Sequence, residues 1–428
     1  MRRGCDAGIR LHNSLSGPTP PALGPEFRKL WASSAVSNLG DGVAVIAAPL
    51  LAVSLTRDPL LVAGLTFAQR APWLLFPLIS GALVDRLDRR QVLGFTAAFR
   101  SALLGLLGLA ALADVMSIPL LYAVFFLLGT AETIFDPASV TVLPTIVARE
   151  NLPRANARLT GTTTVLNGFA GPPIGGFLFA VAAALPFLVG GAAYAAAAVL
   201  ILSLRGSFQV ERDEDARGAR LWSEIAEGVR WLAGRRLLRT LTLALGVMNL
   251  TMGAWNAILV LYARERLGLD ARGYGLLIVG YAGGGIAASV VAPRVVALLG
   301  SSRTLRIGLL IETGTSITLA LSRDPYAAGV VLTLFGFHAV LWGVVVTSLN
   351  QAIVPLGLLG RVNSSYTTIG IGTTALGAPL GGLLAARFGL AAPFWFAACG
   401  MSLLTIVVWR LLSGAAFEAE HLAGAHTV

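Results

Sequence analysis

The sequence predicts an all-α membrane protein of twelve transmembrane helices, arranged as two six-helix pseudo-symmetric bundles. Three observations predict this fold class: a low content of charged residues, a series of long apolar runs, and an internal repeat. Of the 428 residues, 56% are hydrophobic and only 13% are charged, whereas soluble domains carry about 25% charged residues. Since charge is scarce along the whole chain, the protein is expected to be embedded in the bilayer rather than anchored by a single segment.

Twelve apolar runs approach or exceed the roughly 20 residues that a helix needs to cross a bilayer. They cover about 28–55, 60–83, 91–113, 117–146, 156–182, 185–205, 237–263, 272–298, 303–321, 326–354, 362–387 and 391–412. The predicted organisation is a cytoplasmic N-terminal tail (1–27), an N-terminal bundle (28–205), a cytoplasmic linker with an amphipathic helix (206–236), a C-terminal bundle (237–412) and a cytoplasmic C-terminal tail (413–428).

Short matches at nearly one offset indicate that the second half of the chain repeats the first. Asn38-Leu39 matches Asn249-Leu250, and Val142-Leu143-Pro144 matches Ile353-Val354-Pro355, both at an offset of 211 residues. The segments that begin at Arg154 and Gly171 return at Arg361 and Gly377, with offsets of 207 and 206. Two parallel six-span halves are typical of carriers whose halves rock around a central site.

Basic residues are unevenly distributed between the two predicted sides of the membrane. Only six of the 32 basic residues fall on the loops opposite the tails, namely Arg57, Arg264, Arg266, Arg272, Arg323 and Arg387. Because basic loops stay in the cytoplasm, we expect a multi-pass protein of the inner (plasma) membrane with both termini cytoplasmic. This topology accounts for the net charge of +10, so the lipid bilayer and not nucleic acid is the expected partner, and a monomer is expected.

Three motifs occur at defined places along these spans. They are Ser37-Asn38-Leu39-Gly40-Asp41-Gly42, Gly81-x-x-x-Asp85-Arg86-x-x-Arg89-Arg90 and Gly171-Pro172-x-x-Gly175-Gly176. In these motifs the chain resembles the major facilitator superfamily, and within it the branch of drug-type efflux carriers that contains enterobactin and macrolide exporters. Two positions depart from the usual patterns, since Asp88 and Asn167 stand where glycine is usual.

The resemblance implies that the second motif forms a cytoplasmic gate made of Gly81, Asp85, Arg86, Arg89 and Arg90. Asp85 is expected to dock on the helix N-terminus at Asn363-Ser364-Ser365, where unpaired N–H groups carry partial positive charge. The arginines would add breakable pairs with neighbouring acids. The alternative is that the arginines only orient the helices.

The third motif is similar to the antiporter motif of drug exporters. Gly171, Pro172, Gly175 and Gly176 are expected to bend their span and to let another helix approach closely. The resemblance implies a seal against proton leak, and a plain kink is the alternative.

Five charged residues are predicted to lie inside the membrane and to handle protons or substrate: Asp41, Glu132, Asp136, Arg70 and Arg100. A charge at the centre of the bilayer costs about 2.5–3.5 kcal/mol on insertion scales, so such residues are usually kept for function. Glu132 and Asp136 are four residues apart and share one helix face. The alternative is a static pair of arginine and carboxylate that only holds helices together.

The substrate cavity is predicted to lie between the halves and to include Asn38, Asn249, Asn256, Glu312 and His338. A mostly apolar cavity with a few acids favours drug-like or cationic cargo over sugars, because sugar carriers need many polar groups.

The function predicted from these features is secondary active transport: proton-coupled efflux of small amphipathic or drug-like molecules by alternating access. An importer or siderophore carrier of the same fold is the alternative, and a membrane sensor or enzyme is a remote one. The sequence contains no Walker A motif and no evident set of nucleophile, base or metal ligands. We therefore expect neither an enzyme nor a bound metal or cofactor; the expected partners are a small-molecule substrate and protons.

Overall fold

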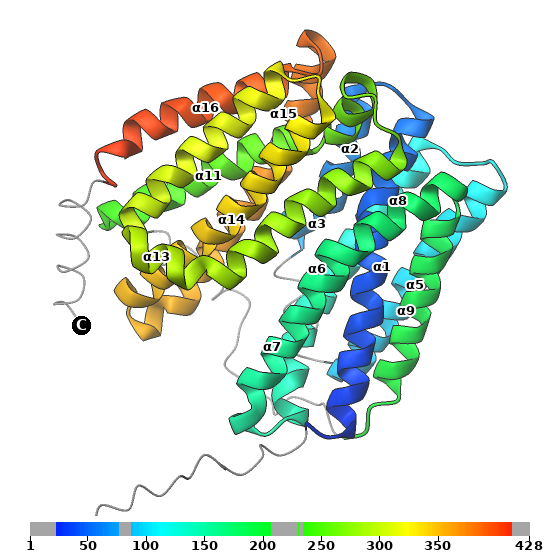
Figure 1. Cartoon of the computed structure of the whole chain (residues 1–428). Helices are drawn as coiled ribbons and strands as arrows, with labels where there is room; N and C mark the ends of the chain where they lie inside the picture. The colour runs from blue at the N-terminus through cyan, green and yellow to red at the C-terminus, as the bar shows by residue number, and fades with distance from the viewer. Residues whose placement is uncertain (1–22, 77–86, 207–229, 231–233, 413–428) are drawn as a thin grey trace, which may run out of the picture.

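The computed structural model describes residues 23–76, 87–206, 230 and 234–412, and this part of the chain is built from helices (Figure 1). In the N-terminal half the main helices are α1 (Pro25–Leu55), α2 (Pro59–Arg70), α3 (Pro72–Leu75), α5 (Arg89–Leu112), α6 (Ile118–Ile146), α7 (Leu152–Thr163), α8 (Gly171–Val181) and α9 (Leu185–Leu202). In the C-terminal half they are α11 (Arg236–Asn256), α12 (Leu259–Leu261), α13 (Ala271–Leu321), α14 (Pro325–Ile353), α15 (Leu356–Phe388) and α16 (Ala392–Trp409).

Ten helices of the described part are long and apolar enough to span a membrane. One of them, α13, has 51 residues, which corresponds to roughly 75 Å and is far more than one bilayer crossing requires. It is interrupted at Gly300, whose φ of 76° and ψ of 157° are not helical. Glycine adopts this backbone conformation at little steric cost. The helix therefore contains two spans, which agree with the predicted runs 272–298 and 303–321.

The second predicted span passes through a proline. Helix α2 ends at Arg70 and the short helix α3 starts at Pro72, while Ala71 between them keeps helical φ and ψ angles of −54° and −39°. Since proline has no backbone N–H, one helical hydrogen bond is missing at this point. The remainder of this predicted span, together with the tails and most of the predicted amphipathic linker, lies outside the described residues.

Glycines of the internal repeat bring equivalent helices together in each half. In the N-terminal half, a β-carbon on Gly171 of α8 would lie 2.6 Å from the Cα atom of Gly42 in α1. In the C-terminal half, a β-carbon on Gly381 of α15 would overlap the carbonyl of Ala254 in α11. Only glycine permits such close approach, so the repeated glycines specify the same helix crossing twice.

The neighbouring glycines of the same repeat hold the two halves against each other. A β-carbon on Gly176 of α8 would lie 2.7 Å from the carbonyl oxygen of Ala271 in α13, and one on Gly382 of α15 would lie 2.7 Å from the Cβ atom of Ala63 in α2. In Figure 1 the helices of the two halves meet at the end that carries α2 and the start of α13, and they diverge toward the end where α7 and the start of α1 lie.

Candidate functional site

Three side chains from three helices form a partly buried polar cluster in the N-terminal half. Arg100 Nη2 of α5 binds Asp41 Oδ1 of α1 at 2.9 Å, and the Tyr194 hydroxyl of α9 donates a hydrogen bond to the same oxygen at 2.5 Å. The guanidinium carbon of Arg100 also lies 4.4 Å from the centre of the Tyr194 ring. The Asp41 carboxylate therefore has two donors, and the arginine has both an anion and an aromatic face.

Close helix packing explains why these side chains meet. A β-carbon on Gly40 of α1 would lie 3.4 Å from the carbonyl oxygen of Gly190, and one on Gly191 would lie 3.2 Å from the Ser101 carbonyl oxygen of α5. Tyr194 follows these glycines by one helical turn and so emerges on the same face of α9. Asp41 and Arg100 are the sequence neighbours of Gly40 and Ser101. The glycines thus place all three groups within bonding distance.

The cluster separates two cavities. A cavity of about 240 Å³ lies between the halves and is lined by α1, α2, α5 and α6 on one side and by Asn256, Tyr274 and Thr374 on the other. A second cavity of about 520 Å³ is lined only by residues of the N-terminal half. We call them the central cavity and the N-half cavity. Asp41 and Arg100 line both, with side chains that are 28% and 9% exposed.

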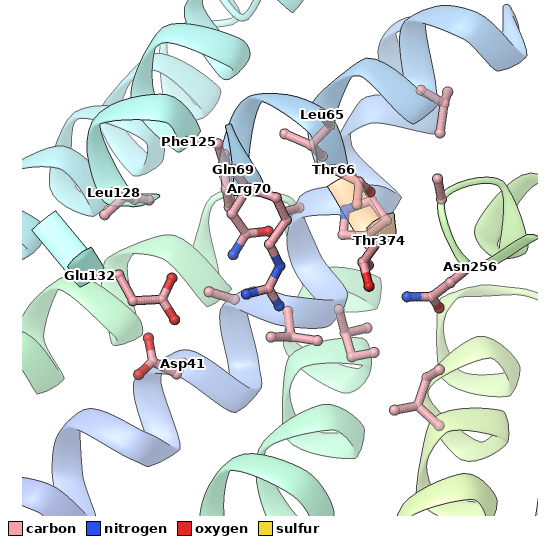
Figure 2. Close-up of a pocket in the computed structure, with 18 of the residues that line it drawn as sticks. Asp41, Leu65, Thr66, Gln69, Arg70, Phe125, Leu128, Glu132, Asn256 and Thr374 are labelled. Atoms are coloured by element: carbon pink, nitrogen blue, oxygen red, sulfur yellow. The ribbon is translucent and has the colours of Figure 1, made fainter. Parts of the chain in front are cut away.

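The two acids of α6 take different places around this cluster. Glu132 lines both cavities, and Asp136 lines the N-half cavity only. The predicted common face therefore places both near Asp41, as the spacing of four residues requires. Figure 2 shows the Glu132 and Asp41 carboxylates on the same side of the central cavity.

Arg70 is the other predicted membrane arginine, and it lines the central cavity at the end of α2. The sequence left open which arginine pairs with which acid. In the structure Asp41 pairs with Arg100, while no ion pair or hydrogen bond links Arg70 to a side chain of the described residues.

The three predicted cavity asparagines are placed differently. Asn38 lines the N-half cavity and Asn256 lines the central cavity. Asn249 lines neither, but its Oδ1 atom accepts a hydrogen bond from the Thr374 hydroxyl at 3.2 Å. Asn38 and Asn249 each donate to the backbone carbonyl four residues earlier, so these repeat partners also share their local hydrogen bonding.

Glu312 and His338 do not line either cavity, contrary to the cavity prediction. His338 Nε2 and Glu312 Oε2 are 3.1 Å apart, and both side chains are nearly fully buried. Gly308 makes room for the histidine, since a β-carbon there would lie 2.5 Å from His338 Nδ1. The ring also packs edge-on against Trp342. The pair joins α13 to α14 inside the C-terminal half.

Only part of the predicted gate falls within the described residues. Gly81, Asp85 and Arg86 lie outside them, as do the side chains of Asn363 and Ser364. The backbone of 363–365 lies inside α15, which begins at Leu356, so the predicted helix N-terminus at these residues is wrong. Arg89 is the first residue of α5.

The gate residue Arg90 has a partner other than the acids that the resemblance implies. Its Nη1 atom donates to the carbonyl of Leu204 at 2.9 Å, beyond the end of α9, where cations are favoured. Asp88, which replaces the usual glycine, caps α5 by accepting from the N–H groups of Arg90 and Gln91.

The third motif lies in the middle of one continuous helical span, Leu152–Val181. A π-helical segment, Thr164–Ala170, precedes α8, which starts at Gly171. Pro172, which cannot donate a backbone hydrogen bond, follows the point where the pattern changes from π to α, and both a proline and a π-helical segment are known causes of a bend. The sequence does not reveal the π-helix. Gly171 and Gly175 face α1, whereas Gly176 faces α13, so the motif lies where the two halves meet.

Sequence reasoning missed Tyr194, Gln69 and Thr374, which all line the central cavity. Tyr194 did carry a signal, because it is the only polar side chain of the helix Leu185–Leu202. Within the described ranges, no group of three or more His, Cys, Asp and Glu side chains could hold a metal ion.

The structure resembles solved transporters of one fold. It matches the nucleoside transporter NupG with a TM-score of 0.69 at 11% identity, over 92% of this chain and 99% of that one. It also matches a bacterial homologue of the iron transporter ferroportin at 18% identity in two states. For the inward-facing state the TM-score is 0.70, over 91% of this chain and 98% of that one. For the outward-facing state the TM-score is 0.58, over 91% of this chain and 99% of that one.

Sequence comparison agrees with this fold. Proteins described as enterobactin exporter EntS, from Shigella boydii and Escherichia coli, are 28% identical over 91% of this chain and 91% of their own length. Residues 16–426 match the family described as transmembrane secretion effector.

The protein is therefore a multi-pass membrane transporter of the major facilitator superfamily, and not an enzyme. Within that superfamily, the chain belongs to the transmembrane secretion effector family. The predicted fold class is confirmed.

Proposed function

We propose that the protein exports a small amphipathic molecule from the bacterial cytoplasm in exchange for protons, and that Asp41 carries the exchanged proton. The observation that carries this proposal is the position of the Asp41–Arg100 pair, which lines both the central cavity and the N-half cavity. A carboxylate in the wall between the two cavities can respond to cargo in the central cavity and exchange a proton with water in the N-half cavity.

The chemistry of the pair suits proton exchange. The charged carboxylate of Asp41 is bound by Arg100 and Tyr194, and these contacts weaken when the carboxylate takes up a proton and loses its charge. Glu132 and Asp136 then offer Arg100 other anionic partners. A change of partner in a tightly packed bundle favours one of two discrete helix arrangements, because packed cores do not deform continuously.

The arrangement of the two halves supports alternating access, of which it represents one state. The halves contact each other through Gly176 and Gly382 near the starts of α13 and α2, a side that the distribution of arginines assigns to the cell exterior. With both termini in the cytoplasm, this arrangement is closed to the outside and opens inward. The higher TM-score to the inward-facing ferroportin homologue supports the same assignment.

Size limits the cargo that the central cavity can hold. Its volume of about 240 Å³ is at or below the lower limit of most ligand pockets. It therefore accommodates a small molecule, or one arm of a larger amphipathic one. The relatives described as exporters support outward transport of such cargo.

The test uses inside-out membrane vesicles with the full-length protein and a panel of fluorescent amphipathic compounds. An imposed gradient, acidic inside, should drive uptake of at least one compound into these vesicles, and collapse of the gradient should stop it. Cargo movement in the direction of proton flow would instead identify an importer.

A further inference from the structure

The end of helix α2 places a positive charge in the middle of the central cavity. Figure 2 shows the Arg70 side chain reaching between the acids Asp41 and Glu132 on one side and Asn256 and Thr374 on the other. Arg70 lines the central cavity but not the N-half cavity. Its position thus differs from that of Arg100, which lines both.

Arg70 lies two residues before the proline of the second span. Ala71 closes α2 through its bond to the Phe67 carbonyl, and Pro72 cannot donate the next helical bond. Gly129 of α6 then lets the chain come close, since a β-carbon there would overlap the Gln69 carbonyl.

The neighbouring charges leave Arg70 without a dedicated anion. The Asp41 carboxylate is already bound by Arg100 and Tyr194. Glu132, the other acid of the central cavity, forms no ion pair with Arg70 among the described residues, and it also borders the N-half cavity. A guanidinium at membrane depth is costly without a counter-charge. Its planar fork of donors binds carboxylates through two parallel hydrogen bonds.

We propose that Arg70 is the receptor for an anionic group of the cargo, so that the transported molecules are amphipathic and carry a carboxylate or a similar oxyanion. Gln69 and Asn256 line the same cavity and supply neutral hydrogen-bonding groups beside the charge. This inference rests on the proposed transport through the central cavity. It reverses the expectation of cationic cargo that the membrane acids favoured.

The test measures equilibrium binding to purified full-length protein in detergent by dialysis, with three probes that share one ring system. These are 1-naphthylacetate (anionic), 1-naphthylacetamide (neutral) and 2-(1-naphthyl)ethylamine (cationic). The protein should bind the acetate about tenfold more tightly than the amide, as expected for one charge-assisted pair. Arg70→Gln should remove this preference without changing amide binding, and Arg70→Lys should restore part of it.

Arg57→Gln is the matched control, because Arg57 is exposed on a loop outside the cavity. A size-exclusion profile like that of the unmodified protein shows that each variant is folded. The proposal is contradicted if 1-naphthylacetate binds no better than the amide, whether both bind or neither does. It is also contradicted if Arg70→Gln weakens the binding of all three probes equally.

The binding assay contains no proton gradient and separates this proposal from the proposed function. An anion preference that depends on Arg70 stands even if export proves not to be proton-coupled. Conversely, proton-coupled export of compounds without regard to their charge would leave the proposed function intact and remove the role of Arg70.

Discussion

Arg100 of α5 binds Asp41 of α1 at 2.9 Å, across 59 residues of sequence and at the wall between two cavities. Neither residue could be solvated by lipid, and each gives the other an opposite charge. The short distance between the two charges suits a contact that only holds helices together, whereas the position of the pair between two cavities suits proton exchange. The two roles make different predictions.

Removal of the Tyr194 hydroxyl tests whether the Asp41 carboxylate is tuned for proton exchange. Tyr194→Phe keeps the ring against Arg100 but deletes the hydrogen bond to Asp41. Since that bond stabilises the charged carboxylate by about 1.5–3 kcal/mol, the pH profile of transport should move toward higher pH. A static contact would lose stability and leave the profile in place. The measurement is the initial rate of transport between pH 5.5 and 8.5.

Substitution of Arg100 should be more harmful alone than together with its partner. Arg100→Gln leaves the Asp41 carboxylate without its counter-charge, and breaking a buried pair costs about 3–5 kcal/mol. Asp41→Asn combined with Arg100→Gln removes both charges and should recover most of that stability, as a double-mutant cycle measures. Thermal unfolding in detergent gives the stabilities. The double variant should still fail to couple transport to protons, so recovery of coupled transport would refute the proposed role of Asp41.

The glycine contacts between the halves predict an effect on conformation. Gly176→Val adds a side chain at a position where its β-carbon alone would lie 2.7 Å from the Ala271 carbonyl oxygen. The halves should then fail to close on the exterior side, and transport should fall about tenfold or more, since overpacking costs about 1–3 kcal/mol. Labelling of an introduced cysteine from outside the cell should increase.

Gly314→Val is the control for that experiment, because no atom of the described structure would lie within 4 Å of a β-carbon added at Gly314. Equal labelling in both variants would show that the contact at Gly176 does not hold the exterior side closed.

The buried pair in the C-terminal half should affect stability and not coupling. Glu312→Ala leaves His338 without its partner inside a packed core, and the loss should be about 3–5 kcal/mol. Gly308→Ala should weaken the same region, because the new methyl group would meet the His338 ring. Transport by the protein that remains folded should keep its usual pH dependence. A changed pH dependence with unchanged thermal stability would show that this pair takes part in proton exchange.

Much of the fold and part of the candidate site were predictable from the sequence, for physical reasons. Long apolar runs predict the spans, the bias of arginines predicts their orientation, and the repeat predicts two similar halves. Asp41, Glu132 and Asp136 were predicted as functional because charge is costly in lipid. The structure places these three around one cluster.

Other features depend on three-dimensional packing and could not be predicted from the sequence alone. Asp41 could have paired with Arg70 or Arg100, and the choice follows from the glycines that join α1, α5 and α9. The burial of His338 with Glu312 depends on space left by Gly308. Arg70 was visible as a charged residue inside a span, but its place in the central cavity was not.

Proton movement caused by cargo tests most directly whether Asp41 carries the exchanged proton. Purified protein is reconstituted in vesicles that contain a trapped pH indicator, and a transported compound is added without any other gradient. The unmodified protein is predicted to give a change in internal pH that follows cargo uptake, and Asp41→Asn is predicted to give none. Cargo-driven proton movement that persists in Asp41→Asn would contradict the central role of this carboxylate.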